Sequence, residues 1–96
     1  MRQLFIVAYD VSDPKRLYRV HKRLLGFGEP QQYSIFLCLL SPKELILMMD
    51  AVEEVIKKSE DRIMVVNLGP EGKSTENRIT CIGMKKELPS RSAIIV

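Results

Sequence analysis

Asp10 is the residue of this chain whose type and position best suit chemistry, because it directly follows the apolar run of residues 4–9. Side chains at the end of a buried strand emerge from the core into a loop, a place that proteins use repeatedly for function. Proteins usually hold Mg²⁺ with one or two carboxylates, waters and substrate phosphate. Such an ion can activate a water and neutralise charge on a phosphodiester, so Asp10 is a candidate ligand for phosphodiester hydrolysis.

A single carboxylate makes a poor nuclease, but a two-fold symmetric dimer could bring two Asp10 side chains together near its axis. Close carboxylates repel and raise one another's pKa, so a cation or a proton is expected between them. The alternative interpretation is structural, with Asp10 capping the following helix or closing an Asx turn. The residues alone leave both interpretations open.

The segment after Asp10 is strongly basic. Residues 14–28 contain five cations and no acid: Lys15, Arg16, Arg19, Lys22 and Arg23. The excess of Lys and Arg over Asp and Glu, which gives the chain its net charge of +3, lies in the first half of the chain. There it would attract polyanions such as nucleic acid. We expect Arg16, Arg19 and Lys22 to contact phosphates that flank the site. A basic helix face that is merely solvated is the alternative.

The remaining side chains carry weaker signals. Tyr9 and Tyr33 could stack on nucleobases or pack in the core, and packing is the favoured interpretation. Ser34 has no base near it that would make it a nucleophile. His21, the only histidine, is expected to be a solvated helix residue. No Walker motif, zinc cluster or acyl-transfer triad is present.

Length and cysteine content set the class of protein. The 96 residues allow one domain, since a second core would need about 100 residues more. The apolar run of residues 4–9 is too short for a signal peptide, so we expect a cytoplasmic protein with no membrane segment. Cys38 and Cys81 lie among apolar neighbours without metal-ligand spacing, and buried free thiols are expected rather than a disulfide.

The spacing of apolar residues predicts two helices. The first has cap and stop signals at Ser12 or Asp13, Pro14, Gly26 and Gly28. The second begins with a capping box at residues 41–44 and should end near Ser59. Strand-like segments are residues 3–9, 31–40, 62–68 and 78–83, with a kink or division of the second at residues 33–34 and a polar loop at 69–77.

This order predicts an α+β ferredoxin-like βαββαβ sandwich over residues 1–96, with an extra C-terminal strand and both helices on one face. Helices on one face should leave the other face polar, yet three of the strands are apolar on both faces. We therefore expect a homodimer formed by sheet stacking. The apolar end of the tail, residues 93–96 within 84–96, would dock on the partner's sheet edge.

Two motifs carry a family resemblance. They are Tyr9-Asp10-Val11-Ser12-Asp13 and Gln32-Tyr33-Ser34-Ile35-Phe36, which are joined by the basic helix and Gly28. Together they resemble the CRISPR-associated endoribonuclease family, the smaller of the two near-universal proteins of spacer acquisition. The later helix, strands and tail also fit, so the resemblance extends over essentially the whole chain.

The resemblance implies a ferredoxin-like homodimer in which Asp10 of both subunits is the catalytic residue and binds one Mg²⁺, with Mn²⁺ as an alternative. It implies cleavage of single-stranded RNA or double-stranded DNA. It also implies binding of protospacer DNA in a complex with the CRISPR integrase, a scaffold role that in some members needs no nuclease activity. Both a metal-dependent endonuclease and a non-catalytic DNA-binding scaffold are therefore hypotheses, with a ligand-sensing regulatory domain as a third.

The resemblance also extends the set of expected nucleic-acid contacts. Arg19 falls at a basic position that the family shares, and Ser34 and Phe36 match its Ser-Val-Phe segment. With Tyr9 they complete the expected contacts: Arg16, Arg19, Lys22, Tyr9, Ser34 and Phe36. Pro30 stands where many members have a basic residue, and Leu17 stands where some have arginine.

Overall fold

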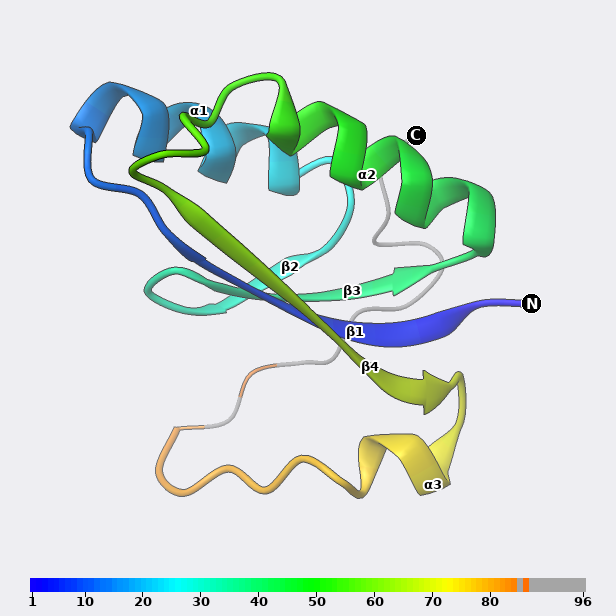
Figure 1. Ribbon diagram of the computed structural model, residues 1–96. Coiled ribbons are helices and arrows are strands. Elements are labelled where there is room, and N and C mark those ends of the chain that lie inside the picture. The colour runs from blue at the N-terminus through cyan, green and yellow to red at the C-terminus, as the bar shows by residue number, and fades with distance from the viewer. Residues whose placement is uncertain (85, 87–96) are drawn as a thin grey trace.

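Both expected helices lie on one face of a four-stranded antiparallel sheet in the computed structural model, which describes residues 1–84 and 86 (Figure 1). The elements are β1 (Gln3–Asp10), α1 (Pro14–Leu24), β2 (Glu29–Gln32), β3 (Ile35–Leu40), α2 (Pro42–Glu53), β4 (Arg62–Pro70) and the short α3 (Lys73–Glu76). The sheet order is β2-β3-β1-β4, so β1 and β3 are central. None of the helices in the described part of the chain is long and apolar enough to cross a membrane.

Local signals start α1 where they were expected. The Asp13 carboxylate accepts a hydrogen bond from the Arg16 amide at 3.0 Å, and Pro14 occupies the first turn, where no amide donor is needed. Val20 and Leu24 are completely buried and hold the helix against the sheet. The cap at Asp13 fixes where the chain leaves β1 and turns into the basic helix.

A complete capping box starts α2. The Ser41 hydroxyl accepts from the Glu44 amide at 3.2 Å, and the Glu44 carboxylate accepts from the Ser41 amide at 2.8 Å. Arg2 donates to the same carboxylate through two nitrogens, at 3.0 and 2.8 Å. These bonds lower the pKa of Glu44 below its ordinary value, and the bond from Arg2 has the largest effect. The start of the chain is thereby tied to the start of α2.

The second helix is shorter than expected, because it ends at Glu53 rather than near Ser59. The carboxylate of Asp61 accepts a hydrogen bond from the Lys57 amide at 2.8 Å, and the Asp61 amide donates to the Lys57 carbonyl at 2.8 Å. A side-chain acceptor that captures a backbone amide in this way competes with helix continuation. Residues 57–61 therefore form a turn that leads into β4.

The expected division of the second strand-like segment occurs. β2 and β3 are separate strands joined by a tight turn at Tyr33 and Ser34, and Ser34 has a positive φ of 64°. β2 lies at the edge of the sheet, where Pro30 removes no central ladder bond. Gly28, just before β2, is buried and lies close against β3.

Two expectations about the region after residue 62 are corrected. β4 extends to Pro70 and contains a register shift beside Leu4 and Phe5, which leaves Leu68 as an extra residue. Residues 78–83 form no strand, because the amides of Arg78 and Ile79 donate to carbonyls of α3 at 3.0 Å. The chain then crosses the open face of the sheet, opposite α1 and α2, rather than pairing along an edge (Figure 1).

The main core lies between the sheet and the two long helices. Its completely buried side chains include Val7, Val20, Leu24, Phe36 and Met48. A smaller cluster lies on the open face, where Leu4 and Leu39 are buried beneath Leu68 and Ile79. The chain's own segment after α3 therefore covers part of the face for which the sequence predicted a partner protomer. The expected docking tail, apart from residues 84 and 86, lies outside the described residues.

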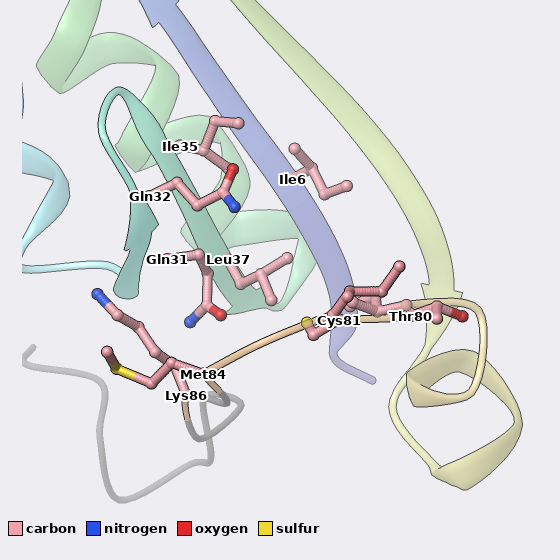
Figure 2. A pocket seen from close by; sticks show the side chains of 11 residues that line it. Ile6, Gln31, Gln32, Ile35, Leu37, Thr80, Cys81, Met84 and Lys86 are labelled. Atoms are coloured by element: carbon pink, nitrogen blue, oxygen red, sulfur yellow. The ribbon is translucent and has the colours of Figure 1, made fainter.

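A pocket of about 310 Å³ lies between this segment and the open face of the sheet (Figure 2). Ile6, Ile35 and Leu37 line it from the sheet, while Cys81 and Met84 line it from the covering segment. Gln31, Gln32, Thr80 and Lys86 provide its polar atoms. Cys81 is exposed, so only Cys38 fits the expectation of a buried thiol, and both cysteines are free. Burial raises the pKa of the Cys38 thiol to about 12.

Candidate functional site

Asp10 ends β1 on the open face of the sheet. Side chains alternate along a strand, and Phe5, Val7 and Tyr9 point into the helix-covered core. Asp10 therefore lies on the opposite face with Ala8, and it is exposed. A shallow hollow of about 270 Å³ beside it is lined by Ala8, Tyr9, Asp10, Arg62 and Met64. The capping alternative for Asp10 is excluded, because Asp13 is the residue that caps α1.

The surroundings of Asp10 fit part of a metal site. Its exposed carboxylate is a hard oxygen donor of the kind that Mg²⁺ prefers. Within the described residues, no group of three or more His, Cys, Asp and Glu side chains could hold a metal ion. Arg62, the cross-strand neighbour of Asp10, is exposed and carries a positive charge toward this edge of the sheet. One chain thus supplies a single carboxylate, and other oxygen donors must come from water, substrate or a second protomer.

Arg16 is engaged by acidic side chains. Its Nε donates to Asp61 Oδ2 at 2.7 Å, and its terminal nitrogen donates to Asp61 Oδ1 at 3.1 Å and to Glu60 Oε1 at 3.2 Å. The Arg16 guanidinium holds the pKa of Asp61 well below its usual range. This environment favours a structural role for Arg16 over the phosphate contact that the sequence suggested.

Three other cations of α1 form an exposed surface. Lys15, Arg19 and Lys22 are exposed, and no ion pair among the described residues involves them. Tyr18, which was not among the expected contacts, lies between them with 62% of its surface exposed. The ammonium of Lys22 lies 5.6 Å from the centre of the Tyr18 ring. The position of Tyr18 off the apolar stripe of α1 was the signal that could have identified it.

Arg23, the fifth cation of α1, lies in the last turn of the helix and is held by the end of α2. Its guanidinium donates to Glu54 Oε1 at 2.5 Å and to the carbonyl of Ala51 at 2.9 Å. The basic helix therefore divides into cations that bind acids of the same chain and cations that face outward. Only Lys15, Arg19 and Lys22 form what we call the basic face of α1.

Tyr9 and Phe36 lie inside the molecule. Phe36 is completely buried and Tyr9 is 6% exposed, so neither ring presents a face to a nucleobase. The Tyr9 hydroxyl lies 3.1 Å from Nδ1 of His21, whose ring packs edge-on against Phe36 at 5.2 Å. Burial, with a smaller contribution from Tyr33, raises the pKa of Tyr9. The expectation of a solvated His21 is corrected, because its ring is part of this cluster.

Ser34 is brought to the site through its backbone. Its carbonyl accepts a hydrogen bond from the Tyr9 amide at 3.1 Å, which fixes the β2–β3 turn beside the end of β1. Tyr33 in the same turn is 86% exposed. The favoured interpretation of Tyr33 as a packed side chain is therefore wrong, whereas Tyr9 does pack in the core. Because neighbouring residues of a strand point to opposite faces, the sequence could have predicted that Tyr9 and Asp10 lie on opposite faces of the sheet.

Comparison with known proteins identifies the family. The family model of the CRISPR associated protein Cas2 matches residues 2–75. The CRISPR-associated endoribonuclease Cas2 of Geobacter sulfurreducens is 33% identical over 96 residues, covering 100% of both chains. A protein of the same name from Thermus thermophilus is 38% identical over 87 residues, covering 90% of this chain and 93% of its own.

A solved structure shows the same fold. The crystal structure of Streptococcus pyogenes Cas2 at pH 6.5 superimposes with a TM-score of 0.71 and 28% sequence identity. The match covers 83% of this chain and 99% of that one. With a family model that spans most of its length and relatives that match it nearly from end to end, this chain belongs to the CRISPR-associated Cas2 family.

Proposed function

We propose that this protein is a metal-dependent endonuclease of CRISPR adaptation, which hydrolyses phosphodiester bonds in single-stranded RNA, double-stranded DNA or both. The position of Asp10 carries the proposal. Its carboxylate is exposed at the end of a central strand, on the open face of the sheet, in a chain whose relatives are named endoribonucleases. A divalent cation, Mg²⁺ or Mn²⁺, would neutralise charge on the phosphate and activate a water there.

The site is proposed to form between two ferredoxin-like protomers. Met64 and Val66 are 47% and 38% exposed on the open face, and Ala8 lies beside them near Asp10. Stacking this surface on a two-fold related copy would cover its apolar side chains and bring two Asp10 carboxylates together. Light scattering that shows only monomers at micromolar concentration would contradict this arrangement.

Replacing Asp10 with asparagine tests the catalytic proposal. Asp10→Asn should abolish cleavage of RNA and DNA in the presence of Mg²⁺ or Mn²⁺, because the amide is a poorer ligand and carries no charge. Dimer formation and nucleic-acid affinity should remain. Asp50→Asn, an exposed acid on α2, is the matched control and should cleave like the wild type. Activity that survives Asp10→Asn or a chelator would refute the proposal.

A second candidate function is a non-catalytic scaffold that binds DNA with the CRISPR integrase in the cytoplasm. The basic face of α1 favours it, because Lys15, Arg19 and Lys22 are exposed and outward-facing. Each phosphate contact that is lost should reduce the slope of log affinity against log salt by about 0.9 for duplex DNA.

The salt slope gives this second candidate a direct test. Arg19→Gln should reduce the slope by about 0.9. Arg23→Gln is the control, because Arg23 is already bound to Glu54 and the slope should not change. Equal slopes for Arg19→Gln and the wild type would refute the role of the basic face. Co-purification of an integrase subunit with the tagged protein would test the partner.

A further inference from the structure

Asp61 is a buried acid on the loop before β4 that contacts the loop after Asp10. Its side chain is completely buried, and five donors surround it. Oδ1 accepts from the Ser12 amide at 3.1 Å, the Ser12 hydroxyl at 3.4 Å and the Arg16 terminal nitrogen at 3.1 Å. Oδ2 accepts from Arg16 Nε at 2.7 Å and from the Lys57 amide at 2.8 Å. The described chain thus satisfies both oxygens.

These bonds join the two chain segments that flank Asp10. Ser12 lies in residues 11–13, the loop that connects Asp10 to the helix cap at Asp13. Asp61 immediately precedes Arg62, the cross-strand partner of Asp10. A hydrogen bond between a backbone amide and a charged, buried carboxylate is stronger than a neutral one. Asp61 therefore holds the loop at Ser12, two residues after Asp10, while the next residue, Arg62, pairs with Asp10 itself.

We propose that Asp61 is a positioning residue for Asp10, and that Arg16 serves this network rather than contacting nucleic acid. The inference rests on the proposed function. Asp61 orders the loop through the Ser12 amide, and Arg16 orients the Asp61 carboxylate from the first turns of α1. Supporting groups of this kind around a metal ligand typically change metal affinity or activity by about 10- to 100-fold when removed.

The charge of Asp61 is required because its carboxylate is the acceptor in all five of these hydrogen bonds. Asparagine has nearly the same shape, but its amide nitrogen would face either Arg16 or the backbone amides of Ser12 and Lys57. Asp61→Asn should therefore release the loop without enlarging any side chain. Glu60→Gln is the matched control, since Glu60 contacts the same Arg16 at 3.2 Å and the Ser12 hydroxyl at 3.4 Å, but it is exposed and does not bond the Ser12 amide.

Three measurements test the proposal on the full-length protein. Asp61→Asn should weaken Mn²⁺ binding and lower kcat about 10- to 100-fold, with KM little changed. Hydrogen exchange of residues 10–13 should accelerate in this variant. Glu60→Gln should stay within about twofold of the wild type in each measurement. If Asp61→Asn behaves like Glu60→Gln, the inference is overturned.

Arg16→Gln gives a second test that does not depend on Asp61→Asn folding. It should weaken Mn²⁺ binding and leave the salt slope of nucleic-acid affinity unchanged. A slope reduced by about 0.9 would show that Arg16 contacts phosphate and would overturn the inference. Wild-type Mn²⁺ affinity in Arg16→Gln would do the same. A wild type that neither binds Mn²⁺ nor cleaves refutes the proposed function, while hydrogen exchange still decides whether Asp61 orders the loop.

Discussion

Replacing Gly28 with alanine should destabilise the fold far more than one added methyl group suggests. A Cβ at position 28 would lie 2.3 Å from the Leu37 carbonyl oxygen, 2.6 Å from Cys38 Sγ and 2.9 Å from Cys38 Cα. Ordinary contact begins at 3.4 Å, so the carbonyl would have to recede by about 1.1 Å. Leu37 is paired with both β1 and β2, so this carbonyl cannot move without disturbing the sheet.

The expected magnitude follows from these contacts. Overpacking of a core costs about 1–3 kcal/mol, and two of the three atoms that Gly28 approaches belong to the backbone, which places this change at the upper end. A loss of about 3 kcal/mol should lower Tm by roughly 12–24 °C in a domain of this size. Thermal unfolding followed by circular dichroism should be compared at one protein concentration, because association shifts Tm.

A double variant separates the two kinds of obstruction. Cys38→Ala removes the Sγ contact but leaves the Leu37 carbonyl in place, so it should not restore the Tm of Gly28→Ala. Full restoration would show that the thiol sets the limit. A Tm for Gly28→Ala within about 3 °C of the wild type, equivalent to less than about 1 kcal/mol, would refute the reasoning altogether.

Two further predictions concern ionisable groups. The pKa of Glu44 is lower in the folded than in the unfolded state, so this carboxylate stabilises the fold above about pH 4.5 and loses that contribution as the pH falls. Glu44→Gln should flatten the acid side of a plot of Tm against pH, and an unchanged slope would contradict this. A thiol reagent at pH 8 should label Cys81 rapidly, whereas Cys38, with its pKa raised to about 12, should react only on unfolding. Rapid labelling of both thiols in the native protein would contradict the burial of Cys38.

The helix starts could be predicted from the sequence because capping is local. Asp13 with Pro14, and Ser41 with Glu44, lie within one turn of the amides that they serve. The two-strand division at Ser34 was also signalled locally. The end of α2 could not be predicted, because it depends on a side chain, Asp61, that belongs to the following turn.

The candidate site was predictable only in part. Asp10 could be identified because a carboxylate directly after a buried strand is conspicuous. The engagement of Arg16 could not, because its partner Asp61 lies in another loop and reaches it only through the fold. The favoured interpretation of Tyr9 as a packed side chain is confirmed, because Tyr9 points to the same face of β1 as Phe5 and Val7. That residues after α3 cover part of the second face could not be predicted, because these contacts form only in the folded chain.

The central place of β1 has a consequence for synthesis of the chain. Residues 3–10 are made before both of their partner strands, residues 35–40 on one edge and residues 62–70 on the other. Pairings so distant in sequence slow folding, and an apolar strand with an open edge is prone to aggregate meanwhile. Translation must therefore reach β4 before β1 is enclosed. Until then the edge of β1 that pairs with β4 stays open, and a product truncated after α2 would keep that edge exposed.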